Sequence, residues 1–168
     1  VDLPESLVFS SDTPSDALEV KTASELPVEV DMHGSGRKHL VLYVEDNPAN
    51  CALVSGIIQQ FRPNLALICE GSAEDGLQTA LCQHPDLILM DINLPGINGL
   101  DALELLAEFD DLRNIPVIAV SADAMPKQID KCLQAGFLNY VTKPINVEQF
   151  LSALDLALDG ASTRAEFI

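Results

Sequence analysis

Leu87-Ile88-Leu89-Met90-Asp91 is a run of four apolar residues that ends in a carboxylate, and a loop rich in Pro and Gly follows at residues 94–99. Continuous apolar runs of this length are typical of buried strands in parallel sheets. In open α/β folds, ligands bind outside the carboxyl ends of such strands. The run therefore predicts both a class of fold and the position of a site.

Four further runs have the same character, and we expect strands at residues 39–44, 65–69, 117–120 and about 138–142. Three of them lead into polar residues, namely Glu45-Asp46, Ser121 and Lys143-Pro144. Between the runs, apolar residues recur at helical spacing. Helices are expected at residues 49–61, 73–83, 100–109, 126–135 and 146–159.

This alternation of strands and helices predicts an α/β fold with helices on both faces of a parallel sheet. Right-handed crossovers favour a doubly wound, five-stranded, flavodoxin-like sheet with the strand order 2-1-3-4-5. Its switch point lies between the first and third strands, which end at Glu45-Asp46 and at Asp91. We place this domain at residues 37–160.

The flanking segments differ from the domain in composition. Residues 1–36 carry eight acids and one base, which is typical of an acidic flexible linker or the tail of a preceding domain. Residues 161–168 are interpreted as a C-terminal tail. The start Val1-Asp2-Leu3-Pro4 lacks Met, so we expect an excised fragment or a processed form.

The net charge of −17 argues against partners that are themselves polyanions. Nucleic acid and anionic membrane surfaces would repel the chain, so we expect neither as a direct partner. The four cysteines have no CxxC spacing, which favours a reducing, cytoplasmic setting. Tethering to a membrane-bound kinase outside this chain is compatible with that setting.

Three acids at one sheet edge would repel one another, and a hard divalent cation would relieve the repulsion. Mg²⁺ fits best, because it takes one or two protein carboxylates together with waters and a phosphate oxygen. An acid pair such as Glu45-Asp46 is also favoured at a helix N-terminus. The metal interpretation therefore depends on Asp91 lying beside that pair.

Asp91 has the setting of a nucleophile, since one side follows an apolar strand and the other faces an open loop. A carboxylate of this kind forms an acyl phosphate in aspartyl-phosphate enzymes. Lys143 would balance its charge and later pair with a phosphoryl group. Ser121 offers a hydroxyl to a phosphoryl oxygen. Taken singly, the three residues also fit a turn acid, a solvated lysine and a helix cap.

Four blocks of sequence together resemble the signature of response-regulator receiver domains. They are Tyr43-Val44-Glu45-Asp46-Asn47, residues 89–99, Val120-Ser121-Ala122 and Tyr140-Val141-Thr142-Lys143-Pro144. They occur in the right order and spacing over residues 38–160. Glu45 stands where many members have Asp, and Ser121 where Thr is common.

The resemblance implies that Asp91 accepts a phosphoryl group from a phosphohistidine on a partner. It implies Mg²⁺ binding by Asp46, Asp91 and the backbone carbonyl of Asn93, with Glu45 acting through water. Ser121 and Lys143 would contact the phosphoryl oxygens. Tyr140 matches the switch aromatic that moves together with Ser121, although a half-buried strand residue is the plainer interpretation.

The implied partner is a histidine kinase dimerisation and phosphotransfer domain or a histidine phosphotransfer protein. Some stretches, such as residues 121–126, look like receivers fused to hybrid sensor histidine kinases, with a single-domain regulator as the alternative. The chain has no Gly-rich ATP lid, so we do not expect it to be a kinase. The only reactions expected of it are its own phosphorylation and dephosphorylation at Asp91. The oligomeric state is left open.

Two other functions stay open at this point. An aspartate-nucleophile phosphatase of the haloacid-dehalogenase type would need a second Asp two residues after Asp91. Asn93 stands there, and an amide cannot donate and recover a proton. A pseudo-receiver that works without phosphorylation is disfavoured by the intact carboxylates, Ser121 and Lys143.

Overall fold

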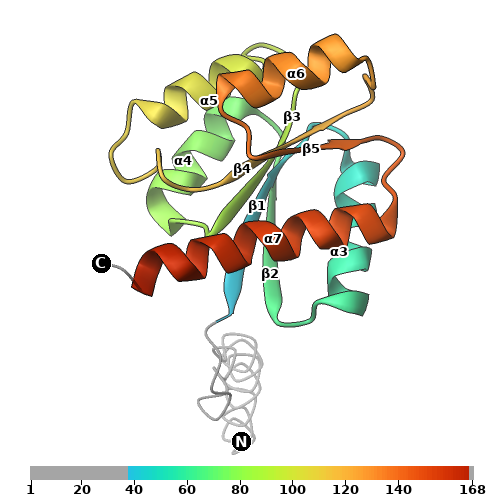
Figure 1. Ribbon diagram of the computed structural model, residues 1–168, viewed down its shortest axis with the longest axis vertical. Helices are drawn as coiled ribbons and strands as arrows, with labels where there is room; N and C mark the ends of the chain where they lie inside the picture. The colour runs from blue at the N-terminus through green and yellow to red at the C-terminus, as the bar shows by residue number, and fades with distance from the viewer. Residues whose placement is uncertain (1–37, 167–168) are drawn as a thin grey trace, which may run out of the picture. The chain divides into compact units, whose positions relative to one another are not determined.

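A five-stranded parallel sheet forms the centre of the protein (Figure 1), with strands in the order β2-β1-β3-β4-β5. The computed structural model describes the backbone of residues 38–166 and the side chains of residues 38–160. The strands are β1 (His39–Val44), β2 (Leu65–Glu70), β3 (Leu87–Asp91), β4 (Val117–Ser121) and β5 (Asn139–Thr142). The predicted fold class and strand order are thus confirmed.

A helix follows each strand, as right-handed parallel crossovers require. The helices are α3 (Pro48–Phe61), α4 (Ala73–Gln83), α5 (Gly99–Ala107), α6 (Pro126–Ala135) and α7 (Val147–Glu166). Helix α7 extends to Glu166 and so includes most of the predicted C-terminal tail, residues 161–168. The predicted linker, residues 1–36, lies outside the described residues.

Side-chain caps start three of the helices close to the carboxyl ends of the strands. Asn47 Oδ1 accepts a hydrogen bond from the Ala49 amide at 2.9 Å, and Pro48 occupies the first turn of α3. Ser72 and Asn98 cap α4 and α5 in the same way. Such caps satisfy amide groups that the helix leaves unpaired. These caps fix where α3, α4 and α5 begin at this edge of the sheet.

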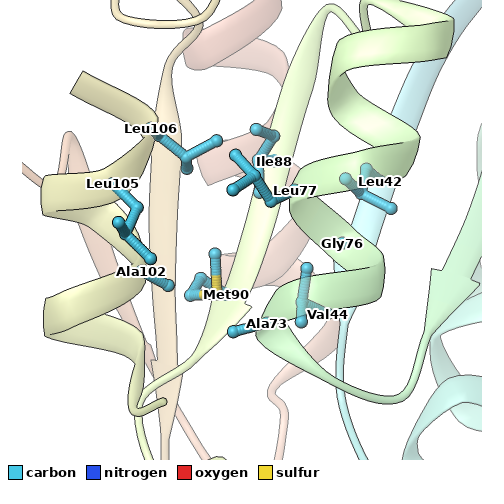
Figure 2. A pocket seen from close by; sticks show the side chains of 10 residues that line it. All are labelled: Leu42, Val44, Ala73, Gly76, Leu77, Ile88, Met90, Ala102, Leu105 and Leu106. Carbon is cyan, nitrogen blue, oxygen red and sulfur yellow. The ribbon is translucent and has the colours of Figure 1, made fainter. Parts of the chain in front are cut away.

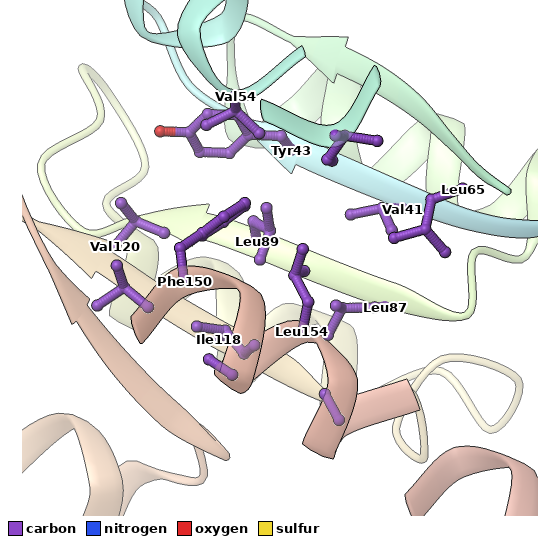
Figure 3. Close-up of a cluster of buried hydrophobic side chains, with 14 of the residues drawn as sticks. Val41, Tyr43, Val54, Leu65, Leu87, Leu89, Ile118, Val120, Phe150 and Leu154 are labelled. Carbon is purple, nitrogen blue, oxygen red and sulfur yellow. The ribbon is translucent and has the colours of Figure 1, made fainter. Parts of the chain in front are cut away.

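The two faces of the sheet carry separate apolar cores. Helices α3 and α7 cover one face, where Tyr43 and Phe150 are among the largest buried side chains (Figure 3). Helices α4, α5 and α6 cover the other face. Strand β3 lies in the middle of the sheet, and each of its residues is buried. Continuous apolar strands are the pattern expected for a sheet covered on both sides.

A small cavity lies between α4, α5 and the sheet, lined by apolar side chains that include Leu42, Met90 and Leu106 (Figure 2). Its volume is about 10 Å³, which is near the minimum for one water molecule. An apolar cavity of this size is a small void in the packing of the core and is too small to be a ligand-binding site.

Helix α4 approaches β1 closely at Gly76. A Cβ atom at this position would lie 2.6 Å from Cγ2 of Val44, which is too close for unbonded carbon atoms. The absence of a side chain therefore sets the spacing between this helix and the sheet. None of the helices in the described part of the chain combines the length and apolar content needed to cross a bilayer.

Replacing Gly76 with Ala should lower the free energy of unfolding by about 1–3 kcal/mol, since the added methyl group overpacks the contact with Val44. Gly56 in α3 is the matched control, because a Cβ there meets nothing within 4 Å. Gly56→Ala should raise stability by up to about 1 kcal/mol through helix propensity. Urea unfolding of both variants measures the difference, and equal effects would contradict the assigned contact.

Candidate functional site

The polar residues singled out in the sequence meet at the carboxyl edge of the sheet. Glu45 and Asp46 follow β1, Asp91 ends β3, Ser121 ends β4 and Lys143 follows β5. In the strand register, Val44 pairs with Met90, Asp91 with Val120 and Ser121 with Thr142. Strands in this register end at nearly the same level. Glu45 and Lys143, which are 98 positions apart in the chain, therefore come into contact.

Lys143 connects two of the acids directly. Its Nζ atom donates to Glu45 Oε2 at 2.5 Å and to Asp91 Oδ2 at 3.1 Å. The two carboxylate side chains are only 1% and 6% exposed, so these ion pairs are largely shielded from water. The Lys143–Pro144 peptide bond is cis. With Asp46 included, three acids face one base, which leaves two negative charges uncompensated.

Glu45 is held by four donors from its surroundings. Its Oε2 atom accepts from the Tyr43 hydroxyl at 2.9 Å and from Asn50 Nδ2 at 3.1 Å, in addition to Lys143. Its Oε1 atom accepts from the Asn47 amide at 3.0 Å. Burial opposes ionisation, but the hydrogen bonds of Lys143, Asn47 and Tyr43 outweigh it and lower the pKa of Glu45 to about 2. Glu45 is therefore ionised at neutral pH.

Asp91 has the opposite balance. Burial raises its pKa, and the charge of Glu45 adds to that effect, whereas the Asn93 amide and Lys143 oppose it. The Asn93 amide donates to Asp91 Oδ1 at 2.9 Å. Burial and the charge of Glu45 make ionisation of Asp91 less favourable than in water, so a further positive charge beside Asp91 would stabilise the carboxylate.

Three acids lie close together at this edge of the sheet. One carboxylate oxygen from each of Glu45, Asp46 and Asp91 lies within 4.8 Å of the others. Asp46 is exposed and Asp91 is buried, so the cluster opens toward solvent on one side. Oxygen donors with two uncompensated negative charges suit a hard divalent cation such as Mg²⁺, which keeps several of its waters.

Ser121 and Tyr140 both contact the loop that follows β4. The Ser121 side chain is completely buried, and its Oγ accepts from the Asp123 amide at 3.1 Å. Asn93 Nδ2 lies 3.5 Å from the same oxygen. The Tyr140 hydroxyl donates to the Asp123 carbonyl at 2.6 Å. Asp123 thus connects the strand-end hydroxyl to the half-buried aromatic residue on the edge strand.

A glycine lets the loop after Asp91 close tightly. The Gly99 amide donates to the Ile92 carbonyl at 3.0 Å, which joins the two ends of the loop. A Cβ atom at Gly99 would lie 2.6 Å from the Asp91 carbonyl oxygen. Any other residue would push α5 away from the strand end that carries Asp91.

Two of the residues that donate to Glu45 receive no role at the site from the sequence pattern. The pattern places Tyr43 in a strand at residues 39–44 and Asn50 in a helix at residues 49–61. A signal for Tyr43 exists, because residues two positions apart in extended chain point to the same side. A phenol at that position, two residues before Glu45, is placed to reach the carboxylate.

The chain matches the family described as "Response regulator receiver domain" over residues 41–155. The polar-differentiation response regulator DivK of Brucella ovis is 39% identical over 121 residues, which are 72% of this chain and 97% of DivK. DivK of Brucella anthropi is 38% identical over the same length.

Solved structures give the same result. The receiver domain of a sensor histidine kinase from Pseudomonas aeruginosa is 27% identical, with a TM-score of 0.65. The similarity covers 72% of this chain and 98% of that domain, which was crystallised with a magnesium ion coordinated in its active-site cleft. The signal receiver domain of a LuxO-type repressor protein from Vibrio parahaemolyticus shares the fold at 23% identity and a TM-score of 0.71.

Replacing Asp91 with Asn should stabilise the metal-free protein, because it removes a buried charge whose ionisation is disfavoured. A gain of roughly 1 kcal/mol would raise the melting temperature in EDTA by about 3–5 °C. Saturating Mg²⁺ should stabilise the wild type more than the variant, because the variant lacks one of the three clustered carboxylates and should bind the cation more weakly. Differential scanning calorimetry with and without Mg²⁺ tests both points, and a variant that melts lower in EDTA contradicts the first.

Glu45→Gln should make the free energy of unfolding less sensitive to pH in the acidic range. The pKa of Glu45 is lowered from 4.5 to about 2, so its contribution to folding is complete above pH 4.5 and is lost as the pH falls toward 2. The wild type should therefore exceed the variant in stability at neutral pH, and the difference should shrink below pH 4.5. Urea unfolding in EDTA at several pH values measures it, and a constant difference would count against the assigned pKa.

Proposed function

Because the chain belongs to the response regulator receiver domain family, we propose that it is the phosphoacceptor module of a two-component phosphorelay. In this proposal, Asp91 receives a phosphoryl group from a phosphohistidine on a partner protein. The observation that carries it is the meeting of Asp91 with Glu45, Asp46 and Lys143 at one sheet edge. The partner is a histidine kinase phosphotransfer domain or a histidine phosphotransfer protein.

The transfer is a nucleophilic displacement at phosphorus. A carboxylate oxygen of Asp91 forms a bond to phosphorus while the phosphorus–nitrogen bond of the ring-protonated phosphohistidine breaks. The leaving imidazole takes the bonding electron pair and is neutral, because it retains the proton on its other ring nitrogen. The product is an acyl phosphate on Asp91. Lys143, which is already beside Asp91, pairs with the incoming phosphoryl oxygens as a point charge.

We assign the cation to Asp46, Asp91 and the backbone carbonyl of Asn93, with Glu45 acting through water. Mg²⁺ bound there supplies positive charge that offsets the charge of the phosphoryl oxygens. The three clustered carboxylates, whose negative charge exceeds the single positive charge of Lys143, support this assignment. The Asn93 amide, which donates to Asp91, keeps that carboxylate in a fixed orientation.

Ser121 and Tyr140 are the proposed switch residues. When the Ser121 hydroxyl turns to a phosphoryl oxygen, the Asp123 amide loses its acceptor. The carbonyl of the same residue accepts from Tyr140, so the rearrangement reaches the edge strand. A phosphoryl group adds about two negative charges and three strong acceptors, which is enough to bias such a local equilibrium. The face formed by α6, β5 and α7 would then change its affinity for partners.

Two settings for the module have support. DivK, of which 97% is matched, favours a regulator that acts without a fused output domain. The receiver of the Pseudomonas sensor histidine kinase favours a position within a hybrid kinase. The chemistry at Asp91 is the same in both, and a cytoplasmic location fits either.

Incubation with acetyl phosphate and Mg²⁺ should add one phosphoryl group, detected by intact mass measurement and removed by hydroxylamine. Asp91→Asn should abolish the adduct. Asp110→Asn is the matched control, because Asp110 is an exposed acid paired with Arg113 away from the site. Its adduct should form as in the wild type.

Two other outcomes would contradict the proposal. Steady release of phosphate from unrelated monoesters without an adduct would indicate a phosphatase. The absence of an adduct with every donor, including a phosphorylated histidine phosphotransfer protein, would indicate a pseudo-receiver.

A further inference from the structure

Tyr43 is a completely buried ionisable group that the proposed phosphoryl transfer does not use. Its ring packs among apolar side chains of β1, β3, α3 and α7, and its hydroxyl lies at the margin of that cluster (Figure 3). A buried hydroxyl needs a hydrogen-bond partner. The partner here is Glu45 Oε2, at 2.9 Å.

The direction of this hydrogen bond is fixed. Burial and the charge of Glu45 raise the pKa of Tyr43, so the phenol keeps its proton and acts as a donor. Asn50 donates its amide to the same carboxylate oxygen from α3. Lys143 is the third donor. Oxygen Oε2 is therefore fully engaged with protein groups, whereas Oε1 accepts only the Asn47 amide among the described residues.

We infer that Tyr43 and Asn50 are positioning residues that hold Glu45 Oε2 against Lys143 and thereby leave Oε1 as the oxygen available to a hydrated Mg²⁺ ion. Within the proposed function, the inference rests on the cation assignment alone, because that assignment gives Glu45 its role toward Mg²⁺. Tyr43 acts from the core side and Asn50 from the solvent side, so the carboxylate is clamped from both.

The physical reason lies in the length of the glutamate side chain. A glutamate has one more rotatable bond than an aspartate and loses more conformational entropy when it is fixed. Because fixed hydrogen-bond donors already orient the Glu45 carboxylate, cation binding does not have to bear the entropic cost of fixing this side chain. Substituting the partners that orient a direct metal ligand typically costs 10- to 100-fold in metal affinity. Because Glu45 acts through water, the lower end of that range applies to its partners.

A double-mutant cycle on Mg²⁺ binding tests the inference. Isothermal titration of the unphosphorylated protein would compare the wild type, Tyr43→Phe, Glu45→Gln and the double variant. We expect Tyr43→Phe to raise the Kd for Mg²⁺ about tenfold in the wild-type background. The same substitution should change the Kd less than about twofold when Glu45 is already Gln, because the two residues act as one unit.

Asn50→Ala provides a second variant that leaves the core intact. It should weaken Mg²⁺ binding in the same direction. Val54→Ala is the control for lost packing, since Val54 lies in the same apolar cluster as Tyr43 (Figure 3). It should lower the melting temperature in EDTA without changing the Kd for Mg²⁺.

Three results would overturn the inference: a Kd for Tyr43→Phe within about twofold of the wild type, an equal loss in both backgrounds of the cycle, or a wild type that does not bind Mg²⁺. The titration uses no phosphodonor, so its result is separate from the adduct measurement. A protein that shows the expected cycle but forms no adduct would disprove the proposed function and leave the assignment of Tyr43 and Asn50 standing.

Discussion

The ion pairs of Lys143 with Glu45 and Asp91 are the constraint on which the rest of the site depends. Two carboxylates buried at one sheet edge would repel each other strongly without a positive charge between them. Lys143 directly follows the edge strand β5, and its side chain reaches past the end of β4 to Asp91 and Glu45. The lysine side chain is long and flexible enough for this path. Ser121, the buried residue at the end of β4, is small and leaves room for it.

The strand order makes this arrangement possible. Strands β1 and β3 are neighbours although a complete strand–helix unit separates them in the chain, and their ends carry the acids. The helices then have to begin close to those ends. Gly76 allows α4 to approach β1, and Gly99 allows α5 to start against the backbone of Asp91. Packing and site geometry are therefore decided by the same few contacts.

Much of this could be predicted from the sequence, because each strand is an apolar run with a marked end. Apolar runs identify buried parallel strands, and parallel strands bring their carboxyl ends to one edge. The clustering of Glu45, Asp46, Asp91 and Lys143 follows from these two rules, and the structure places them together.

Other features depend on where individual side chains point, which the spacing of residues along the sequence does not determine. The hydrogen bond from Tyr43 to Glu45 does not follow from the sequence, because a tyrosine fits a buried strand without any role at the site. Only the path of its side chain shows the hydroxyl reaching the carboxylate. Leu53 and Phe61 have the spacing of a buried helical face but are 49% and 43% exposed. Helix α3 has apolar residues around more of its circumference than the sheet covers, so spacing alone cannot identify its buried side.

The hydrogen bond between Gly99 and Ile92 has a consequence for how proteins of this kind diversify. It closes the intervening segment at its base, so that the turn around Pro95 and Gly96 is mechanically separated from the strand below. Insertions or substitutions at that tip can alter what the surface presents to other molecules while the chemistry underneath keeps its geometry. A loop closed at its base by a hydrogen bond thus allows the partner-binding surface to change in evolution without a change in the geometry of the reacting carboxylate.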